Sequence, residues 1–174
     1  MQKIHLEAIQ RMLARGTIGP STVRGQGPPG VAAAARAFLA ALGLEPFGTS
    51  DARKFSGELD RQTSRLMNAL PSGAQTWGLA RKCLNLMLRE ALYNVYLREE
   101  YGLDRAEAFY EIPLDSLVAE GLRSRRPRSL PTWPGVRHLD PDMSAKYQAA
   151  AASVAAAEGI VRVHLDAIIW GADR

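Results

Sequence analysis

The chain has 174 residues, of which 47% are apolar, and its 22 basic against 18 acidic residues give a formal net charge of +4. This length and composition suffice for one substantial core, so we expect a single domain over residues 1–174. No apolar run reaches the ~18–20 residues of a membrane span, and the N-terminus lacks the apolar stretch of a signal peptide. We therefore expect a cytoplasmic protein with no membrane partner. The single cysteine, Cys83, excludes an internal disulfide and a four-cysteine zinc site.

Helical patterns follow one another along the chain, and no segment shows the alternation of a half-buried strand, so an all-α fold is predicted. In the N-terminal part, helices are expected over 1–15, 31–42 and 57–70. The glycine- and proline-rich segments 19–30 and 46–50 are expected to be loops. A long helix that contains Lys82 is expected to run to Tyr101, before Gly102. Further helices are expected over 103–110, from Asp115 through Leu122, over 141–158 after the Asp140-Pro141 start signal, and from His164 or Asp166 to Trp170.

Lys82 is the first candidate catalytic residue. It is one of only four lysines and lies in the largely apolar run 77–88. Helical spacing places Leu79, Leu86, Arg89 and Tyr93 near the same face. Burial disfavours the charged ammonium, and a neutral amine can attack an electrophilic carbon. Alternatively, the lysine extends to solvent from the first turn of its helix and pairs with a nearby acid.

Asp115 is the second candidate. It follows Lys82 by 33 residues, in the run Ile112-Pro113-Leu114-Asp115 at an expected helix start. An ordinary N-cap explains such an aspartate. A capping role is compatible with catalysis, because hydrogen bonds and the positive helix end keep the carboxylate ionised. An anchored anion of this kind can stabilise a developing oxocarbenium charge or activate an attacking group.

The C-terminal run 163–170 contains a candidate binding pair. Asp166 and Trp170 are four residues apart and share a helix face. A carboxylate beside an aromatic plane suits a purine-like ring, which stacks on one and hydrogen-bonds to the other. In the alternative interpretation, Asp166 caps a helix and Trp170 packs in the core. The three histidines show no metal-ligand spacing, so no metal and no cofactor are expected.

A basic segment precedes residue 138. Arginines cluster with prolines between residues 123 and 137, and an arginine fork suits phosphate oxygens. The candidate phosphate contacts are Arg123, Arg125 and Arg126. A solvated basic loop is the alternative.

Three segments together resemble the helix-hairpin-helix DNA glycosylase superfamily, most closely its archaeal 8-oxoguanine DNA glycosylase/AP lyase branch. The run Gly78-Leu79-Ala80-Arg81-Lys82 is similar to the Gly-x-Gly-x-Lys hairpin that leads into the catalytic-lysine helix, with Ala80 at the second glycine. The run 112–115 resembles the segment of the catalytic aspartate. Residues 160–170 resemble the terminal helix that contacts the damaged base. The match covers 70–122 and 158–171.

The resemblance implies a helix-hairpin-helix glycosylase-like fold with the active site in a cleft between two helical parts. Residues 70–122 would supply the hairpin, the lysine helix and the aspartate segment, and residues 1–69 with 141–174 the remaining part. Lys82 and Asp115 would be catalytic. The base would contact Asp166, Trp170, Arg89 and Leu86, and the DNA would contact Gly78, Ala80, Arg81, Arg123, Arg125 and Arg126. Arg89 stands where the archaeal branch carries a lysine.

This pattern leads us to expect a monomeric DNA glycosylase with AP lyase activity that excises a modified, 8-oxoguanine-like purine through a lysine Schiff base in base excision repair. An alternative within the same class is an antiphage glycosylase that removes modified bases from phage DNA. A non-catalytic helical DNA-binding module is the alternative from another class, and a helical interaction domain unrelated to DNA is a third.

Overall fold

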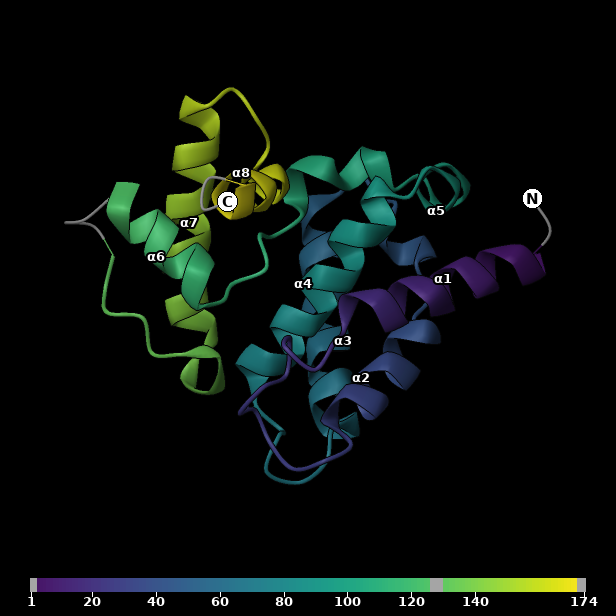
Figure 1. The fold of residues 1–174 in the computed structure, drawn as a ribbon. Coiled ribbons are helices and arrows are strands. Elements are labelled where there is room, and N and C mark those ends of the chain that lie inside the picture. Colours follow the sequence, from purple (N-terminus) through teal and green to yellow (C-terminus); the bar gives the residue numbers. More distant parts are fainter. Residues whose placement is uncertain (1–2, 126–129, 172–174) are drawn as a thin grey trace.

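The computed structural model describes residues 3–125 and 130–171, and its regular elements are all helical (Figure 1). The α-helices are α1 (Lys3–Thr17), α2 (Val31–Ala40), α3 (Ala52–Ala69), α4 (Trp77–Tyr93), α5 (Val95–Tyr101), α6 (Ser116–Arg125), α7 (Pro141–Ala157) and α8 (Leu165–Gly171). Short 3-10 helices are η1 (Glu45–Phe47), η2 (Leu103–Phe109), η3 (Val136–His138) and η4 (Arg162–His164). The predicted all-α fold class is confirmed for the described residues.

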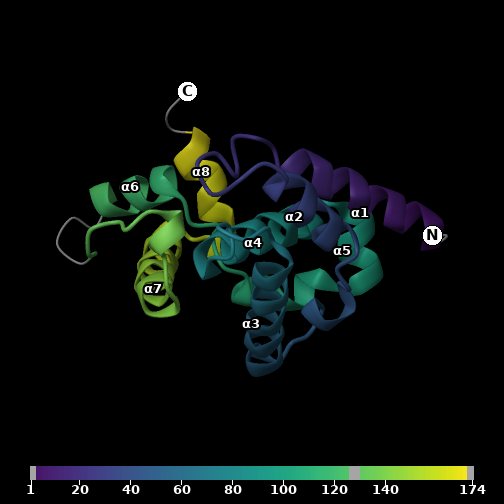
Figure 2. The same cartoon turned by 90° about the horizontal axis from the view of Figure 1, so that it is seen from below.

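The helices form two parts, which are joined by the segment 110–115 (Figures 1 and 2). The first part packs α1 to α5 around one apolar core, whose largest members include Phe47, Phe55 and Leu84. The second part packs α6, α7 and α8 around a separate core centred on Tyr147. Two cores joined by a short extended segment leave a boundary at which side chains from both parts meet.

Helix starts follow the capping residues in the sequence. The Asp115 carboxylate accepts the amide of Val118 at 3.0 Å, and the Asp140 carboxylate accepts the amide of Met143 at 2.7 Å. Both predicted N-caps are therefore confirmed. Asp51 caps α3 in the same way, so this helix begins at Ala52 and not near residue 57 as predicted. The glycine at position 57 lies inside the helix, where it costs about 1 kcal/mol relative to alanine.

The long helix predicted to reach Tyr101 is divided into two helices at Asn94. This residue adopts an extended conformation, with φ −79° and ψ 113°, and its side chain accepts the amide of Leu97 at 3.2 Å. Asparagine competes with the helical backbone for hydrogen bonds, which explains the break. The second helix ends at Gly102, where φ is +60° and a side chain would be strained. Within the described part of the chain, no helix is long and apolar enough to cross a membrane.

The run similar to a glycosylase hairpin lies inside α4 and does not form the turn of a hairpin. The turn that joins α3 to α4 is made by residues 70–76. A side chain at Gly78 would collide with the carbonyl oxygen of Val136 and lie 2.7 Å from Leu139 Cβ. This glycine therefore allows close packing of the segment that contains η3, and the main chain beside it is covered.

Candidate active site

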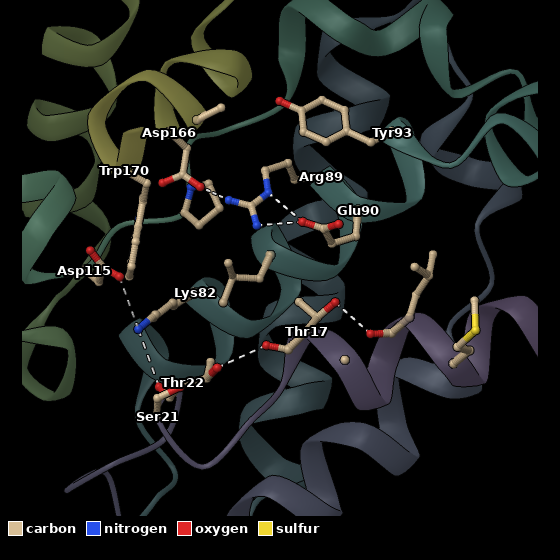
Figure 3. A pocket seen from close by; sticks show the side chains of 16 residues that line it. Thr17, Ser21, Thr22, Lys82, Arg89, Glu90, Tyr93, Asp115, Asp166 and Trp170 are labelled. Atoms are coloured by element: carbon tan, nitrogen blue, oxygen red, sulfur yellow. Dashed lines mark hydrogen bonds and ion pairs between the residues drawn. The ribbon is translucent and has the colours of Figure 1, made fainter. Parts of the chain in front are cut away.

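A cavity of about 750 Å³ lies between the two helical parts. One wall is the face of α4, the opposite wall is α8, and the remaining sides come from α1, the loop after it and the segment 110–115 (Figure 3). Its lining residues are Met12, Leu13, Gly16, Thr17, Ser21, Thr22, Lys82, Leu86, Arg89, Glu90, Tyr93, Pro113, Asp115, Asp166, Ala167 and Trp170. Every residue predicted to be catalytic or to contact a base is in this set.

Lys82 occupies the second turn of α4, and its side chain is only 10% exposed. The ammonium nitrogen lies 3.6 Å from Asp115 Oδ2 and donates to the carbonyl oxygen of Thr22 at 3.5 Å (Figure 3). The amine is thus held at the cavity wall between a carboxylate and a main-chain oxygen. The lysine therefore does not extend to solvent, but the pairing with a nearby acid that the alternative interpretation predicted is present.

The two carboxylate oxygens of Asp115 have different partners. Oδ1 caps α6 through the amide of Val118, while Oδ2 faces Lys82. Residues 112–114 are buried and lie outside the helices, and Asp115 follows them at the start of α6, so the aspartate lines the cavity from the second helical part. Capping and contact with the lysine are therefore simultaneous.

An ion-pair network crosses the cavity above the lysine. The guanidinium of Arg89 is paired with the buried carboxylate of Asp166 and also donates to Glu90 at 2.6 Å (Figure 3). This network joins α4 to α8. Trp170 lies one helical turn beyond Asp166 and is 45% exposed. Its ring is therefore a free apolar surface at the wall and not the core packing of the alternative interpretation.

The formal charges at the cavity favour a cation over an anion. The lining includes two basic side chains, Lys82 and Arg89, and three carboxylates, Glu90, Asp115 and Asp166. A site of this composition can stabilise positive charge that develops on a reacting carbon, which is the effect of charges fixed before the reaction. It offers no cluster of free cations for a phosphate group.

Cys83 follows the lysine directly but faces away from the cavity into the core. Burial raises the pKa of its thiol to about 12, against the opposing influence of the Lys82 charge. A thiol with this pKa stays protonated at neutral pH and is a poor nucleophile. Of these two neighbouring residues, Lys82 is therefore the nucleophile candidate that lines the cavity.

The sequence interpretation missed the contribution of the N-terminal region to the cavity. The last two turns of α1 and the loop after it supply six lining residues, among them Thr17 and Thr22. The Thr22 hydroxyl donates to the carbonyl oxygen of Thr17 at 3.0 Å and accepts the amide of Gly19 at 3.2 Å, which fixes the loop beside Lys82. The Gly-Pro-Ser-Thr run was recognisable as a turn, but no local pattern showed that it faces residue 82.

Arg81 was predicted to contact DNA, and the structure places its side chain in an internal ion-pair network. The guanidinium is 7% exposed and is bound to Glu111 at 2.8 and 2.9 Å and to Asp60 at 2.8 Å. A guanidinium that is already surrounded by carboxylates is not free for phosphate. Gly78 and Ala80 are also buried, so the predicted direct contacts of these three residues with DNA are not supported.

The basic segment lies away from the cavity. Arg123 and Arg125 are exposed in the last turn of α6, about 15 Å of helix rise from the capping Asp115. Arg126 lies outside the described residues. Among the described residues, no three His, Cys, Asp or Glu side chains are grouped to hold a metal ion.

Comparison of the chain with protein-family models, with curated proteins and with solved structures found no match. The functional interpretation therefore depends on the geometry of the cavity and on the motifs in the sequence.

Proposed function

We propose that the protein is a DNA glycosylase with AP lyase activity that excises a modified purine through a Schiff base on Lys82. The observation that carries the proposal is the position of this amine. It is largely buried at the wall of a cavity of about 750 Å³, 3.6 Å from the Asp115 carboxylate, with Asp166 and Trp170 on the opposite side. The two-part helical architecture is compatible with the helix-hairpin-helix glycosylase resemblance.

In the proposed reaction, the neutral Lys82 amine attacks C1′ of an extruded nucleotide. The bond between C1′ and the base nitrogen breaks, and the base leaves with the bonding electron pair and takes up a proton. The amine loses a proton and the sugar ring opens, which gives an imine between Nζ and C1′. Removal of a C2′ proton then expels the 3′ phosphate, so the strand is cut by β-elimination.

Asp115 has two roles in this sequence. Its Oδ2 accepts the proton that Lys82 must lose before attack and passes this proton on to the departing base. The carboxylate is thereby ionised again and stabilises positive charge on the sugar. The distance of 3.6 Å is slightly longer than a hydrogen bond, and catalytic hydrogen bonds commonly shorten once substrate is bound. Its cap on α6 holds the carboxylate in place.

The base is proposed to lie between α4 and α8. Trp170 offers a stacking surface and Leu86 an apolar contact. Arg89 offers a base edge the N–H groups that its pairs with Asp166 and Glu90 do not use, and Asp166 offers a carboxylate acceptor. Extruding a base costs a few kcal/mol, which stacking and edge contacts must offset. A modified purine presents both a large ring and additional polar atoms to such a surface.

DNA phosphates are proposed to contact the exposed arginines of α6, Arg123 and Arg125, and not the cavity. This division is supported by charge, since the cavity lining contains more carboxylates than cations. The end of α6 lies about 15 Å of helix rise from Asp115. A duplex that continues over this distance beyond the cavity brings its phosphates to the two arginines. Replacing both arginines by alanine should weaken DNA binding uniformly across sequences and lower its salt dependence.

The test is strand cleavage and base release on a duplex that contains one 8-oxoguanine, measured under single turnover. Asp115→Asn should retain the cap, because asparagine is also a good N-cap, yet should slow the reaction by roughly 10²–10⁴-fold. Asp140→Asn is a matched control, because Asp140 caps α7 in the same way and does not line the cavity. Equal rates in the two variants would contradict the role of Asp115.

A non-catalytic DNA-binding module predicts a different pattern. In that case the wild-type protein binds the duplex with the salt dependence of phosphate contacts but releases no base and cuts no strand. Substitution of Lys82 by glutamine would then leave every measured property unchanged. Lys146 lies on the exposed face of α7 and provides a control. Base release that is lost in Lys82→Gln and retained in Lys146→Gln supports the glycosylase over the binding module.

A further inference from the structure

A second polar cluster, formed by Tyr93, His164 and Glu107, lies at the end of the α4 wall farthest from Lys82. The Tyr93 hydroxyl lies 3.0 Å from His164 Nδ1, and His164 Nε2 lies 2.9 Å from Glu107 Oε1. The tyrosine and imidazole rings also stack, with centroids 5.6 Å apart and planes inclined by 13°. The three residues come from α4, η4 and η2, so the cluster joins the two helical parts.

The direction of these hydrogen bonds follows from the phenol. Burial raises the pKa of Tyr93, with Glu90 and Glu107 acting in the same direction and Arg89 opposing. The protonated phenol can donate to Nδ1 of His164, and in the tautomer that accepts this hydrogen bond Nε2 carries the proton and donates to Glu107. Each polar group of the cluster has a defined partner, and the tyrosine ring has a fixed orientation.

Among these residues, Tyr93 is the one that lines the cavity. His164 covers one face of its ring, and the side chain as a whole remains 44% exposed. Lys82, Arg89 and Tyr93 follow one another along the same face of α4 (Figure 3). At 1.5 Å per residue, Arg89 lies about 10 Å and Tyr93 about 16 Å along the helix from the lysine.

We infer that Tyr93 determines specificity by limiting the size of the base that the cavity accepts, and that His164 and Glu107 are positioning residues that hold its ring. The inference rests on the proposed function. A base joined to C1′ beside Lys82 extends along α4 past Leu86 toward Arg89. A larger substituent extends one further helical turn, to Tyr93. Because this ring is fixed by a hydrogen bond and by stacking, it cannot rotate aside as a free surface tyrosine would.

The experiment compares single-turnover base release from duplexes that contain 8-oxoguanine, O6-benzylguanine or N2-benzylguanine. Cleavage of an abasic duplex by the same protein serves as the reference, because that substrate requires Lys82 but contains no base. The wild-type protein should excise 8-oxoguanine at least 100-fold faster than either benzylated base. Tyr93→Ala should raise the rate of benzylguanine excision relative to the rate of 8-oxoguanine excision at least tenfold for one of the two benzylated bases.

Conservative variants test the positioning role. Tyr93→Phe retains the ring and loses its hydrogen bond, so its ratio should lie between those of the wild type and Tyr93→Ala, and Glu107→Ala should behave similarly. Tyr96→Ala is the matched control, because Tyr96 lies on α5, is 54% exposed and does not line the cavity. A general loss of stability slows all substrates alike and does not change the ratio.

The possible failures are distinguishable. If the wild-type protein cleaves abasic and 8-oxoguanine duplexes but Tyr93→Ala has the same ratio as Tyr96→Ala, the inference about Tyr93 is wrong and the proposed function stands. If the wild-type protein acts on neither duplex, the proposed function and this inference are both overturned.

Discussion

Replacing Glu111 by glutamine should remove the main stabilising charge beside Arg81. The Arg81 guanidinium, 7% exposed, makes two hydrogen bonds to Glu111, and the same carboxylate accepts Asn85 Nδ2 at 2.9 Å. Breaking a buried ion pair by removing one partner costs roughly 3–5 kcal/mol. Since Arg81 keeps its 2.8 Å contact with the exposed Asp60, we expect the lower end, about 3 kcal/mol.

The effect should depend on pH in a defined direction. Burial alone would raise the pKa of Glu111, but hydrogen bonds and charge from Arg81, with Asn85 and Arg162, hold it below its ordinary value. A carboxylate whose pKa is lowered by folding stabilises the protein above its unfolded pKa of roughly 4.3 and loses this contribution as the pH falls through the folded value. The difference between wild type and Glu111→Gln should therefore be constant from about pH 6 to 8 and shrink in acid.

Urea denaturation followed by circular dichroism measures this difference, with an unchanged slope showing that the unfolding reaction is the same. Glu7→Gln is the matched control, because Glu7 pairs with Arg11 at 3.8 Å with both side chains about half exposed. Its effect should stay below about 0.5 kcal/mol. A change of less than about 1 kcal/mol for Glu111→Gln, or one equal to that of Glu7→Gln, would refute the assignment of Arg81 to a structural network.

Three further outcomes are expected. Cys83 is buried and its pKa is raised to about 12, so a maleimide at pH 7 should label it only after unfolding, and rapid native labelling would contradict the described packing. Gly78→Ala should destabilise the protein by roughly 1–3 kcal/mol in urea denaturation, because a main-chain oxygen occupies the space of the added methyl group; an unchanged midpoint would argue against that contact. Thr22→Val should loosen the loop whose carbonyl faces Lys82, costing about 1 kcal/mol of stability and slowing strand cleavage, and cleavage at the wild-type rate would show that the loop does not orient the amine.

Sequence patterns predicted the parts of this structure that depend on local chemistry. Asp115 and Asp140 cap their helices because an aspartate side chain satisfies free amides in the first turn, whatever the rest of the fold does. Helical spacing likewise placed Lys82 and Arg89 on one wall of the cavity. The break at Asn94 was missed, because an asparagine can also be tolerated within a helix when tertiary contacts favour it.

Features that depend on distant contacts were not accessible from the sequence. Arg81 pairs with Glu111, 30 residues away, and with Asp60, 21 residues away, so a surface role was an equally reasonable prediction from local pattern. The contact between the Thr22 carbonyl and Lys82 spans 60 residues. The sequence run around Gly78 is similar to a glycosylase hairpin, and it does not reveal that the missing side chain of this glycine makes room for the segment that contains Val136.

Borohydride trapping on labelled DNA tests the central claim most directly, because reduction converts an imine between protein and sugar into a stable covalent bond. Duplexes with an abasic site or one 8-oxoguanine are incubated with the wild-type protein, Lys82→Gln and the exposed-lysine control Lys146→Gln, and peptide mapping locates the adduct. We expect an adduct on Lys82 for the wild type and Lys146→Gln, and none for Lys82→Gln. An adduct on another residue, or undiminished trapping by Lys82→Gln, would contradict it, as would the absence of any adduct on either duplex.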